Sequence, residues 1–581
     1  MNVLTIEGNQ FLYNGKPIQL ITGALHYFRV VPEYWHDRLV KLKACGFNGV
    51  ETYVPWNLHQ PEPEKFNFSG MADIGAFIET AAALDLFVIV RPSPYICSEW
   101  EFGGLPAWLL EDDNMRLRCS YQPYLDRVDA YYDVLMPKLK PYLATNGGPV
   151  IAMQIENEYG SYGNDTSYLE YLRDGMINRG IDVLLFTSDG YDDFTLQGGM
   201  IPGTLETLNF GSQPEAAFAK LIEYQPDKPL MCMEYWNGWF DHWGEQHHTR
   251  GHEDVADVLD RMLAMGASVN FYMFHGGTNF GFYNGANYSD KYEPTVTSYD
   301  YNALLTESGA VTDKYYAIRE IITRYTNLDP RPLPEPIPAR SYGEIRMNQS
   351  VGLFESLELL SSSVRSTCPE PMEKLGQAYG FILYTTYITG PRSVSELIVQ
   401  DVCDRALVFV DDEYRGVIER WDPKPLMLEI TENGIKLSLL VENMGRINYG
   451  PFLKDRKGIT EGVRLGQQYL FDWTIYPLPM TDMSKLCYRN DVHSVTTTPA
   501  FYRGTFTVDE KADTFLELPG WTKGVAYINS FNLGRYWEIG PQRTLYIPAP
   551  LLNKGENELV LFELHCTQSA KVTLRDRAVI G

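Results

Sequence analysis

The sequence lacks runs of lysine and arginine, and it lacks long apolar stretches. Its 49 Lys and Arg residues face 75 Asp and Glu residues, which gives a formal net charge of −26. Proteins that bind nucleic acids or anionic membranes carry a basic patch, and this sequence offers none. No segment reaches the ~18 uncharged apolar residues that a bilayer-crossing helix needs. We therefore expect no nucleic-acid partner, no membrane partner and an uncharged substrate.

Cofactor and metal motifs are also missing. The eight cysteines are scattered, without a Cys-x-x-Cys pair or a histidine at metal-ligand spacing. His247, His248 and His252 form no His-Glu-x-x-His pattern, and the glycines of segment 276–281 match neither a Walker A loop nor a dinucleotide fingerprint. We expect no cofactor and no metal. Free thiols, together with the absence of an export signal, favour the cytoplasm as the location.

The first 300 residues alternate short apolar runs with amphipathic segments of helical length, which is typical of βα units around a parallel sheet. Helices are predicted at 32–45, which begins with Pro and is followed by Gly46, and at 252–265, which is followed by Gly266. The eight candidate strands are residues 18–27, 47–54, 86–91, 150–155, 183–187, 207–210, 230–234 and 268–274. They predict a (β/α)8 TIM barrel within residues 1–328.

Beyond the barrel the character of the sequence changes. A single hydrophobic core stops growing near ~250–300 residues, so a chain of 581 residues must form further domains. A Pro-rich linker is predicted at 329–345. Segments 407–416 and 525–534 each run from apolar residues through a polar turn to Gly, as hairpins of β-sandwiches do. We expect two antiparallel β-sandwich domains, and the predicted ranges are 346–370 for a strand segment joining the C-terminal domain, 371–460 for the first sandwich and 461–581 for the second.

An acidic pair closes the fourth predicted strand, in the segment Gln154-Ile-Glu-Asn-Glu-Tyr-Gly160. TIM-barrel enzymes keep their active sites at the face where strands turn into loops. Alternation along a strand would place Glu156 and Glu158 on one side, where two carboxylates repel each other unless one sits at the start of the loop. A solvated loop edge is the alternative interpretation, and a second isolated acid elsewhere weakens it.

That second acid is Glu234, at the end of the otherwise apolar seventh strand. Burial of an uncompensated carboxylate is costly, so this position needs a reason. Glycoside hydrolysis supplies one, because it uses a proton donor and a second carboxylate on the two sides of a sugar. Strands four and seven face each other across a barrel, so their ends can hold two carboxyl groups about 5–5.5 Å apart, as in a retaining enzyme. The alternative is a salt bridge from Glu234 to Arg91 or Arg29.

Both acidic motifs resemble those of glycoside hydrolase family 35, the β-galactosidases with catalytic acids on strands four and seven. Further segments look like blocks of this family in family order, namely residues 51–56, 91–108, 233–236, 275–281 and 297–302. Segments 443–450 and 540–548 are similar to the β-domains of its bacterial members. The resemblance covers nearly the whole chain. It implies that the two sandwiches are jelly-roll-like and that the second is of a galactose-binding type.

The resemblance implies a retaining exo-β-galactosidase in which Glu158 is the general acid/base, Glu234 the nucleophile and Glu156 a supporting group. The implied galactose pocket consists of Tyr53, Ile96, Ser98, Glu99, Asn157, Tyr272, Tyr299 and Tyr301. Two residues depart from the family pattern. Ser98 stands where many relatives have Ala, and Asn302 stands where many have Asp, which affects individual contacts and leaves the reaction intact.

Three tryptophans, Trp236, Trp239 and Trp243, lie at or just beyond the end of the nucleophile strand. We expect Trp239 and Trp243 to form an aromatic slot on the aglycone side, with Tyr449 reaching over from a β-domain; a hydrophobic plug under the loop is the alternative. The sequence itself does not reveal the galactosyl linkage, but the similarity to bacterial members of the family implies a short oligosaccharide with a terminal β-1,3-linked galactose as the substrate. Another exo-β-glycosidase of the same clan and a non-catalytic carbohydrate-binding protein are the rival functions. The oligomeric state stays open, a homodimer included.

Overall fold

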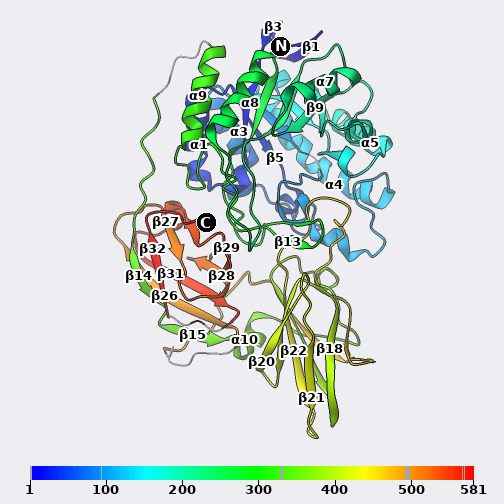
Figure 1. The fold of residues 1–581 in the computed structure, drawn as a ribbon, viewed down its shortest axis with the longest axis vertical. Helices are drawn as coiled ribbons and strands as arrows, with labels where there is room; N and C mark the ends of the chain where they lie inside the picture. Colours follow the sequence, from blue (N-terminus) through cyan, green and yellow to red (C-terminus); the bar gives the residue numbers. More distant parts are fainter. Residues whose placement is uncertain (1–2, 93, 327–331, 491–497, 566, 568–569) are drawn as a thin grey trace.

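The computed structural model describes residues 3–92, 94–326, 332–490, 498–565, 567 and 570–581. Its upper part in Figure 1 is a closed barrel of parallel strands in the order β10-β11-β4-β5-β6-β7-β8-β9. The barrel strands are β4 (Ile21–Leu25), β5 (Gly49–Tyr53), β6 (Phe87–Arg91), β7 (Val150–Gln154), β8 (Leu184–Asp189), β9 (Leu205–Phe210), β10 (Met231–Trp236) and β11 (Ser268–His275). Each overlaps one predicted strand, so the predicted barrel is confirmed.

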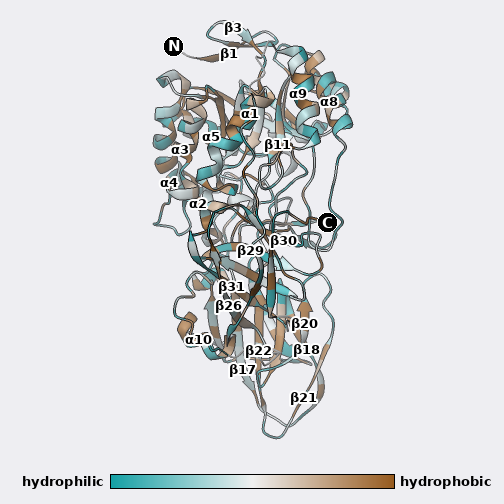
Figure 2. Ribbon diagram, turned by 90° about the vertical axis from the view of Figure 1, so that its left-hand side faces the viewer, coloured by the Kyte–Doolittle hydropathy of each residue, from teal (hydrophilic) through white to brown (hydrophobic). Residues whose placement is uncertain are grey.

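Helices surround the barrel and pack their apolar faces on it, and Figure 2 shows teal and brown residues mixed along them. They are α1 (Trp35–Cys45), α2 (Trp56–His59), α3 (Ile74–Ala83), α4 (Gln122–Leu139), α5 (Thr166–Asn178), α6 (Asp193–Gly199), α7 (Pro214–Tyr224), α8 (His252–Ala264) and α9 (Asp313–Tyr325). Helix α1 ends at Gly46, whose φ of 109° lies in the left-handed region that glycine favours. Both helices predicted from Pro and Gly signals are confirmed.

The first predicted strand is shorter than expected. Residues 16–18 form β3 (Lys16–Ile18), which belongs with β1 (Leu4–Glu7) and β2 (Gln10–Tyr13) to a separate small sheet at the end of the barrel marked N in Figure 1. The carboxyl ends of the barrel strands therefore face the β-domains in the lower half of Figure 1. This is the face on which TIM-barrel enzymes carry their active sites.

The segment after the barrel leads first to the C-terminal domain. Of the predicted linker, residues 327–331 lie outside the described residues, and residues 332–338 form no helix or strand. The strand β14 (Gly343–Arg346) begins within the predicted linker and pairs with β32 (Lys571–Arg575). Next, β15 (Gln349–Gly352) pairs with β26 (Ala500–Val508), and α10 (Leu353–Leu360) leads toward the first β-domain.

The first β-domain is a sandwich of two sheets, β16-β25-β17-β22-β19-β20 and β21-β18-β23-β24, around its own apolar core. Its strands are β16 (Val364–Ser366), β17 (Phe381–Ile388), β18 (Arg392–Cys403), β19 (Arg405–Val410), β20 (Glu413–Glu419), β21 (Leu426–Ile430), β22 (Ile435–Glu442), β23 (Gly458–Leu465), β24 (Gln468–Tyr469) and β25 (Trp473–Leu478). The predicted boundary at 460/461 falls inside β23. Because β23 pairs with β18 and β25 pairs with β17, residues 461–478 belong to this first sandwich and not to the second.

The C-terminal domain combines the sheets β14-β32-β27-β30 and β15-β26-β31-β28-β29. Its remaining strands are β27 (Thr514–Glu517), β28 (Lys523–Ile528), β29 (Phe531–Trp537), β30 (Thr544–Ile547) and β31 (Gly555–Glu563). Both predicted hairpins are confirmed, as β19-β20 and as β28-β29. In the described part of the chain, no helix combines the length and apolar character that spanning a bilayer requires.

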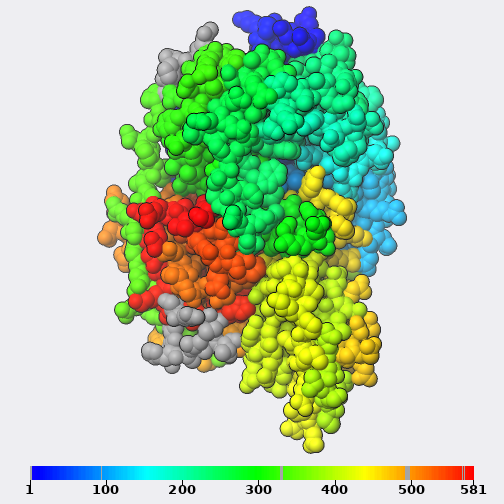
Figure 3. All heavy atoms as spheres, viewed as in Figure 1, coloured from blue at the N-terminus to red at the C-terminus, as the bar shows by residue number. Residues whose placement is uncertain are grey.

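The three parts are packed together by buried contacts. Phe282 from a barrel loop, Phe381 from β17 and Phe562 from β31 share one apolar cluster, so side chains of all three domains meet there. Figure 3 shows yellow atoms of the first β-domain that extend upward along the barrel between green and blue atoms. The face of the barrel that carries the strand ends is therefore covered in part by another domain.

Candidate active site

Both predicted catalytic acids line one pocket at the carboxyl ends of the barrel strands. The pocket has a volume of about 190 Å³. Its walls come from barrel strands, from the loops that follow them and from the first β-domain, and they consist of Tyr53, Cys97, Ser98, Glu99, Asn157, Glu158, Glu234, Trp236, Trp239, Phe240, Tyr272, Asn287, Tyr301 and Tyr449. The predicted location of the site on the barrel agrees with this pocket.

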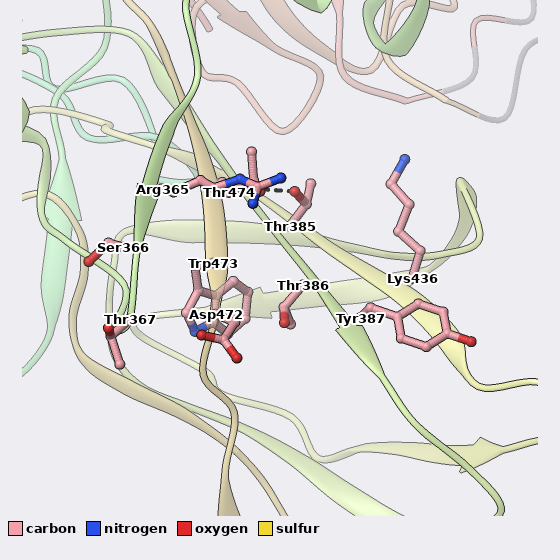
Figure 4. A pocket seen from close by; sticks show the side chains of 10 residues that line it. All are labelled: Arg365, Ser366, Thr367, Thr385, Thr386, Tyr387, Lys436, Asp472, Trp473 and Thr474. Atoms are coloured by element: carbon pink, nitrogen blue, oxygen red, sulfur yellow. Dashed lines mark hydrogen bonds between the residues drawn. The ribbon is translucent and has the colours of Figure 1, made fainter.

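A larger cavity, of about 650 Å³, lies on the first β-domain (Figure 4). Hydroxyl groups and the basic side chains of Arg365 and Lys436 dominate its lining, and Asp472 is the one carboxylate among its lining residues. Figure 4 shows Asp472 and Lys436 well separated across this cavity. A single carboxylate cannot supply both a proton donor and a nucleophile, so the barrel pocket is the better candidate for glycoside chemistry.

Glu234 is held in place by three donors. One oxygen, Oε1, accepts hydrogen bonds from Tyr53 Oη and Arg91 Nη2, each at 2.7 Å, and the other accepts one from Trp236 Nε1 at 3.1 Å. The Arg91 guanidinium lies 4.0 Å from the centre of the Tyr53 ring. Charge-assisted hydrogen bonds of this kind stabilise the ionised carboxylate. The salt bridge from Glu234 to Arg91, which the sequence offered as an alternative to catalysis, is present. Glu234 lines the pocket as well, so the two roles are compatible.

Arg91 is shared with a second carboxylate below the pocket. Its Nη1 atom lies 3.9 Å from Oε1 of Glu51, and both side chains are fully buried. Burial raises the pKa of Glu51 to about 7, although the charge of Arg91 opposes this shift. At lower pH Glu51 is neutral, and the charge of Arg91 is then directed mainly to Glu234. Arg29, the other predicted partner of Glu234, donates to Ser98 and Asn279 instead.

Glu158 has a different environment. It follows β7 with a φ of 46°, and its Oε1 accepts a hydrogen bond from Asn209 Nδ2 at 3.0 Å. Asn209 is itself fixed by the hydroxyl of Ser188 at 2.7 Å. Burial first, and the nearby charge of Glu234 second, raise the pKa of Glu158 to about 8, while the Asn209 hydrogen bond lowers it. At neutral pH Glu158 is therefore mainly a protonated acid.

Glu156 does not compete with Glu158 for the same space. Its two oxygens accept hydrogen bonds from Arg118 at 2.9 and 2.8 Å, and Tyr168 also donates to it. Arg118 donates in addition to the backbone carbonyl of Asn157 at 2.7 Å. The repulsion expected between the two acids is thus avoided, because a buried cation compensates Glu156. This ion pair fixes the turn from which Glu158 projects.

A loop after β6 forms the opposite wall. Cys97, Ser98 and Glu99 all have positive φ angles, between 46° and 58°, which non-glycine residues adopt rarely. Glu99 accepts a hydrogen bond from Tyr299, and burial raises the pKa of Glu99 to about 7. Tyr272 lies 3.1 Å from the Tyr299 hydroxyl and donates to Ser98 at 3.2 Å. The wall therefore offers sugar hydroxyls a carboxyl group and several hydroxyl groups in fixed positions.

The first β-domain supplies part of the pocket through the segment 443–450. Arg446 forms a buried ion pair with Glu101 of the loop after β6. The backbone of Asn448 accepts a hydrogen bond from Tyr95 and donates one to Ala286 at 2.9 Å. These contacts tie the segment to the two loops that flank the pocket. At its end Tyr449 is 40% exposed and lines the pocket, as predicted for a residue that reaches over from a β-domain.

Three predicted site residues do not line the pocket. Ile96 is fully buried against Gly104, where an added Cβ would come within 2.9 Å of its side chain. Tyr299 lies behind the wall, where it supports Glu99 and Tyr272. Trp243 is buried and its ring lies 6.3 Å from that of Trp537 in the C-terminal domain. The predicted aromatic slot is therefore wrong for Trp243, which packs as a plug between domains.

Several lining or supporting residues escaped the sequence analysis. Phe240 directly follows Trp239 and stacks on it with ring centres 5.0 Å apart. Asn209 is the next-to-last residue of the sixth predicted strand, so the strand-end rule that identified the acids could also have found it. Asn287 lies on the short strand β12 (Ala286–Tyr288), where no sequence pattern marks it. Cys97 is a buried thiol in the wall.

One group of side chains in the described residues has metal-ligand geometry. Ligand atoms of Cys403, Asp404 and Asp455 lie within 4.8 Å of one another. Lys457 Nζ lies 2.7 Å from Asp404 and 2.8 Å from Asp455, and Arg420 contacts both carboxylates. These two cations already compensate the acids, so the group is an ion-pair cluster in the first β-domain.

Three models of known protein families together match most of the chain. A model described as "Glycosyl hydrolases family 35" matches residues 10–325. A model described as "Beta-galactosidase, first all-beta domain" matches residues 369–479, and one described as "Beta-galactosidase, galactose-binding domain" matches residues 499–557.

Curated relatives match over nearly their full length. The "Beta-galactosidase" of Xanthomonas manihotis is 45% identical, with 93% of this chain and 90% of the relative covered. The human "Beta-galactosidase" is 43% identical, with 99% and 90% covered. The mouse "Beta-galactosidase-1-like protein" is 42% identical, with 100% and 92% covered.

The ion pair between Arg118 and Glu156 leads to a prediction on stability. Replacement of Arg118 by Met leaves Glu156 buried without a cation, and we expect this to lower the free energy of unfolding by about 3–5 kcal/mol. Urea denaturation followed by tryptophan fluorescence measures the change. As a control, Lys65→Met removes an exposed ion pair with Glu62 and should cost about 1 kcal/mol or less. Equal stability of the two variants would contradict the supporting role of Arg118.

Proposed function

Because the chain belongs to glycosyl hydrolase family 35, we propose that it is a retaining exo-β-galactosidase that releases terminal β-galactosyl residues by double displacement. The observation that carries the proposal is the pair of unlike carboxyl groups in one pocket. Glu158 has a pKa raised to about 8, whereas Glu234 accepts hydrogen bonds from a guanidinium, a phenol and an indole. One acid that holds its proton beside a carboxylate fixed by three donors is the arrangement that this reaction needs.

In the first step, an oxygen of Glu234 attacks the anomeric carbon while Glu158 donates its proton to the departing glycosidic oxygen. The bond to the aglycone breaks, and a galactosyl ester of Glu234 forms. The ester has no negative charge, so one cause of the raised pKa of Glu158 disappears. Glu158 then accepts a proton from the water that attacks the ester, and galactose leaves with its original anomeric configuration.

The size and lining of the pocket support an exo-acting enzyme. Its volume of about 190 Å³ is below the ~300–1,000 Å³ of typical ligand pockets, which suits one sugar ring better than an internal chain segment. We assign the galactosyl unit to the wall formed by Tyr53, Ser98, Glu99, Asn157, Tyr272 and Tyr301. Hydrogen bonds to the sugar hydroxyls, that of the 2-hydroxyl above all, strengthen in the oxocarbenium-like transition state.

The aglycone side is the part of the pocket near Trp236, Trp239 and Tyr449. Trp239 and Tyr449 are each 40% exposed, and the two come from different domains. We propose that they contact the second sugar and that the preferred linkage is β-1,3. The relatives found are both mammalian and bacterial, so the bacterial subtype with this linkage is part of the proposal.

Location and assembly are further proposals. The seven cysteines that the structure describes are free thiols, which accords with the cytoplasmic location expected from the sequence. We propose a homodimer as the assembly. Light scattering measures the molar mass that tests this proposal.

A substrate panel tests the proposed reaction. We expect hydrolysis of nitrophenyl β-galactoside in preference to the β-glucoside and the β-N-acetylglucosaminide. Among galactobiosides, we expect the β-1,3 isomer to be cleaved faster than the β-1,4 and β-1,6 isomers, as measured by galactose release. Preference for another nitrophenyl sugar would indicate a different exo-glycosidase, and absence of any hydrolysis would indicate a carbohydrate-binding protein.

Azide rescue tests the two catalytic roles. Glu158→Ala should lose about 10²–10⁴-fold in rate on substrates with poor leaving groups, and azide should restore turnover with β-galactosyl azide as the product. Glu234→Ala should give the α-anomer, because azide then attacks in place of the missing nucleophile. NMR identifies the anomers, and the opposite pattern would exchange the roles of the two residues.

The pH profile tests the environment of Glu158. The protonated form is active, so kcat/KM should fall as the pH rises through about 8, and the fall should be absent in Glu158→Gln. Asn209→Ala removes a donor that stabilises the carboxylate, so the pKa of Glu158 should rise and the fall should move up by roughly one pH unit. An unchanged profile in Asn209→Ala would show that this hydrogen bond does not set the pKa.

A further inference from the structure

Asn287 is a half-buried side chain of the pocket to which neither the family resemblance nor the reaction assigns a role. It lies on β12, which pairs with β13 (Tyr292–Pro294) in a hairpin after the last barrel strand. The catalytic steps use Glu158 and Glu234 and leave Asn287 aside. Its neighbours in the pocket include Trp239 and Phe240.

The orientation of the Asn287 amide is set by His242. Oδ1 of Asn287 lies 2.9 Å from Nε2 of His242, and Nδ1 of the same ring lies 3.0 Å from Oε1 of Glu245. The other oxygen of Glu245 accepts the backbone N–H of His242 at 2.8 Å. Burial lowers the pKa of His242, but the hydrogen bonds to Glu245 and Asn287 outweigh burial and raise it. Contacts with a carboxylate at Nδ1 and with an amide oxygen at Nε2 require the protonated ring, in which Nδ1–H faces Glu245 and Nε2–H donates to Oδ1 of Asn287.

As a consequence, the Asn287 amide is a hydrogen-bond donor with a fixed orientation in the pocket wall. Since Oδ1 accepts from His242, the amide nitrogen of Asn287 is turned away from the ring. An amide nitrogen carries two N–H donors. Within the described ranges of the chain, no hydrogen bond joins this nitrogen to a protein group, and the side chain lines the pocket. The site therefore contains an N–H donor whose orientation is fixed by His242 and which has no acceptor among the described protein groups.

The position of this donor indicates which part of a substrate it meets. The galactosyl wall of Ser98, Glu99 and Tyr272 is held together by hydrogen bonds within the wall and to Tyr299. Asn287 is attached instead, through His242, to the aromatic side of the pocket, because the His242 ring packs 5.4 Å from that of Phe240, and Phe240 stacks on the half-exposed Trp239. An aromatic face beside an N–H group suits a sugar ring, which offers an apolar face and oxygen acceptors at its rim.

We propose that Asn287 is a specificity residue that donates a hydrogen bond to an oxygen of the second sugar, the one linked to the departing glycosidic oxygen. This inference rests on the proposed function. Asn287 acts on substrate directly, and His242 with Glu245 acts as its positioning pair. The enzyme then distinguishes a disaccharide from a galactoside whose aglycone has no acceptor.

The test compares two substrates in two variants of Asn287. Asn287→Asp keeps the shape and the acceptor for His242 but removes the N–H donor and adds a negative charge, so Asn287→Ala, which removes the whole group without adding charge, is the deciding variant. For galactosyl-β-1,3-N-acetylglucosamine we expect kcat/KM to fall by about 3- to 10-fold in both variants, mainly through KM. For phenyl β-galactoside, whose aglycone has no acceptor atom beyond the glycosidic oxygen, we expect no change.

A matched control lies on the same strand. Tyr288 packs its ring 4.8 Å from that of Phe452, and it does not line the pocket, so Tyr288→Phe should leave both substrates unaffected. Equal losses on the two substrates, or no loss on either, in Asn287→Ala would overturn the role of Asn287 and leave the galactosidase activity standing. Failure of the wild-type protein to cleave either substrate would overturn the proposed function itself.

Discussion

The charge on Glu234 is the constraint on which the rest of the site depends. Arg91, Tyr53 and Trp236 donate hydrogen bonds to this carboxylate, and its charge in turn helps Glu158 to keep a proton at neutral pH. The two side chains belong to β10 and to the loop after β7, so they are brought together only by closure of the barrel. An enzyme that must donate a proton and attack with an anion at one pH needs this inequality between two chemically identical groups.

Around the pocket, buried arginines likewise form ion pairs with buried carboxylates. The chain carries a large negative net charge, yet the loops around the site are fixed by cations that pair with acids inside the fold. Arg118 compensates Glu156, and Arg446 compensates Glu101. Such pairs contribute little net stability against an apolar replacement, but loss of one partner is costly. They hold the positive-φ turns that present Ser98, Glu99 and Glu158.

Local patterns in the sequence were enough for the barrel and its acids. Apolar runs of strand length identified all of its strands, and the rule that active groups follow strand ends located Glu158 and Glu234. What failed depends on contacts between distant segments. The end of the first sandwich was misplaced because β23 pairs with β18, which lies some sixty residues earlier in the chain. Trp243 was assigned to the pocket because its burial depends on Trp537 from another domain. Asn287 was missed because its role follows from the ring behind it and not from its sequence neighbours.

Tyr449 and the segment that carries it have a consequence for how the protein can be divided. The module that performs the chemistry does not close its own binding site, since Tyr449, more than a hundred residues downstream of the barrel, lines the pocket from a sandwich. An isolated barrel would therefore be an incomplete enzyme, even if it folded. Conversely, exchange of this one sandwich between relatives would be a route to new acceptor preferences with the catalytic machinery untouched.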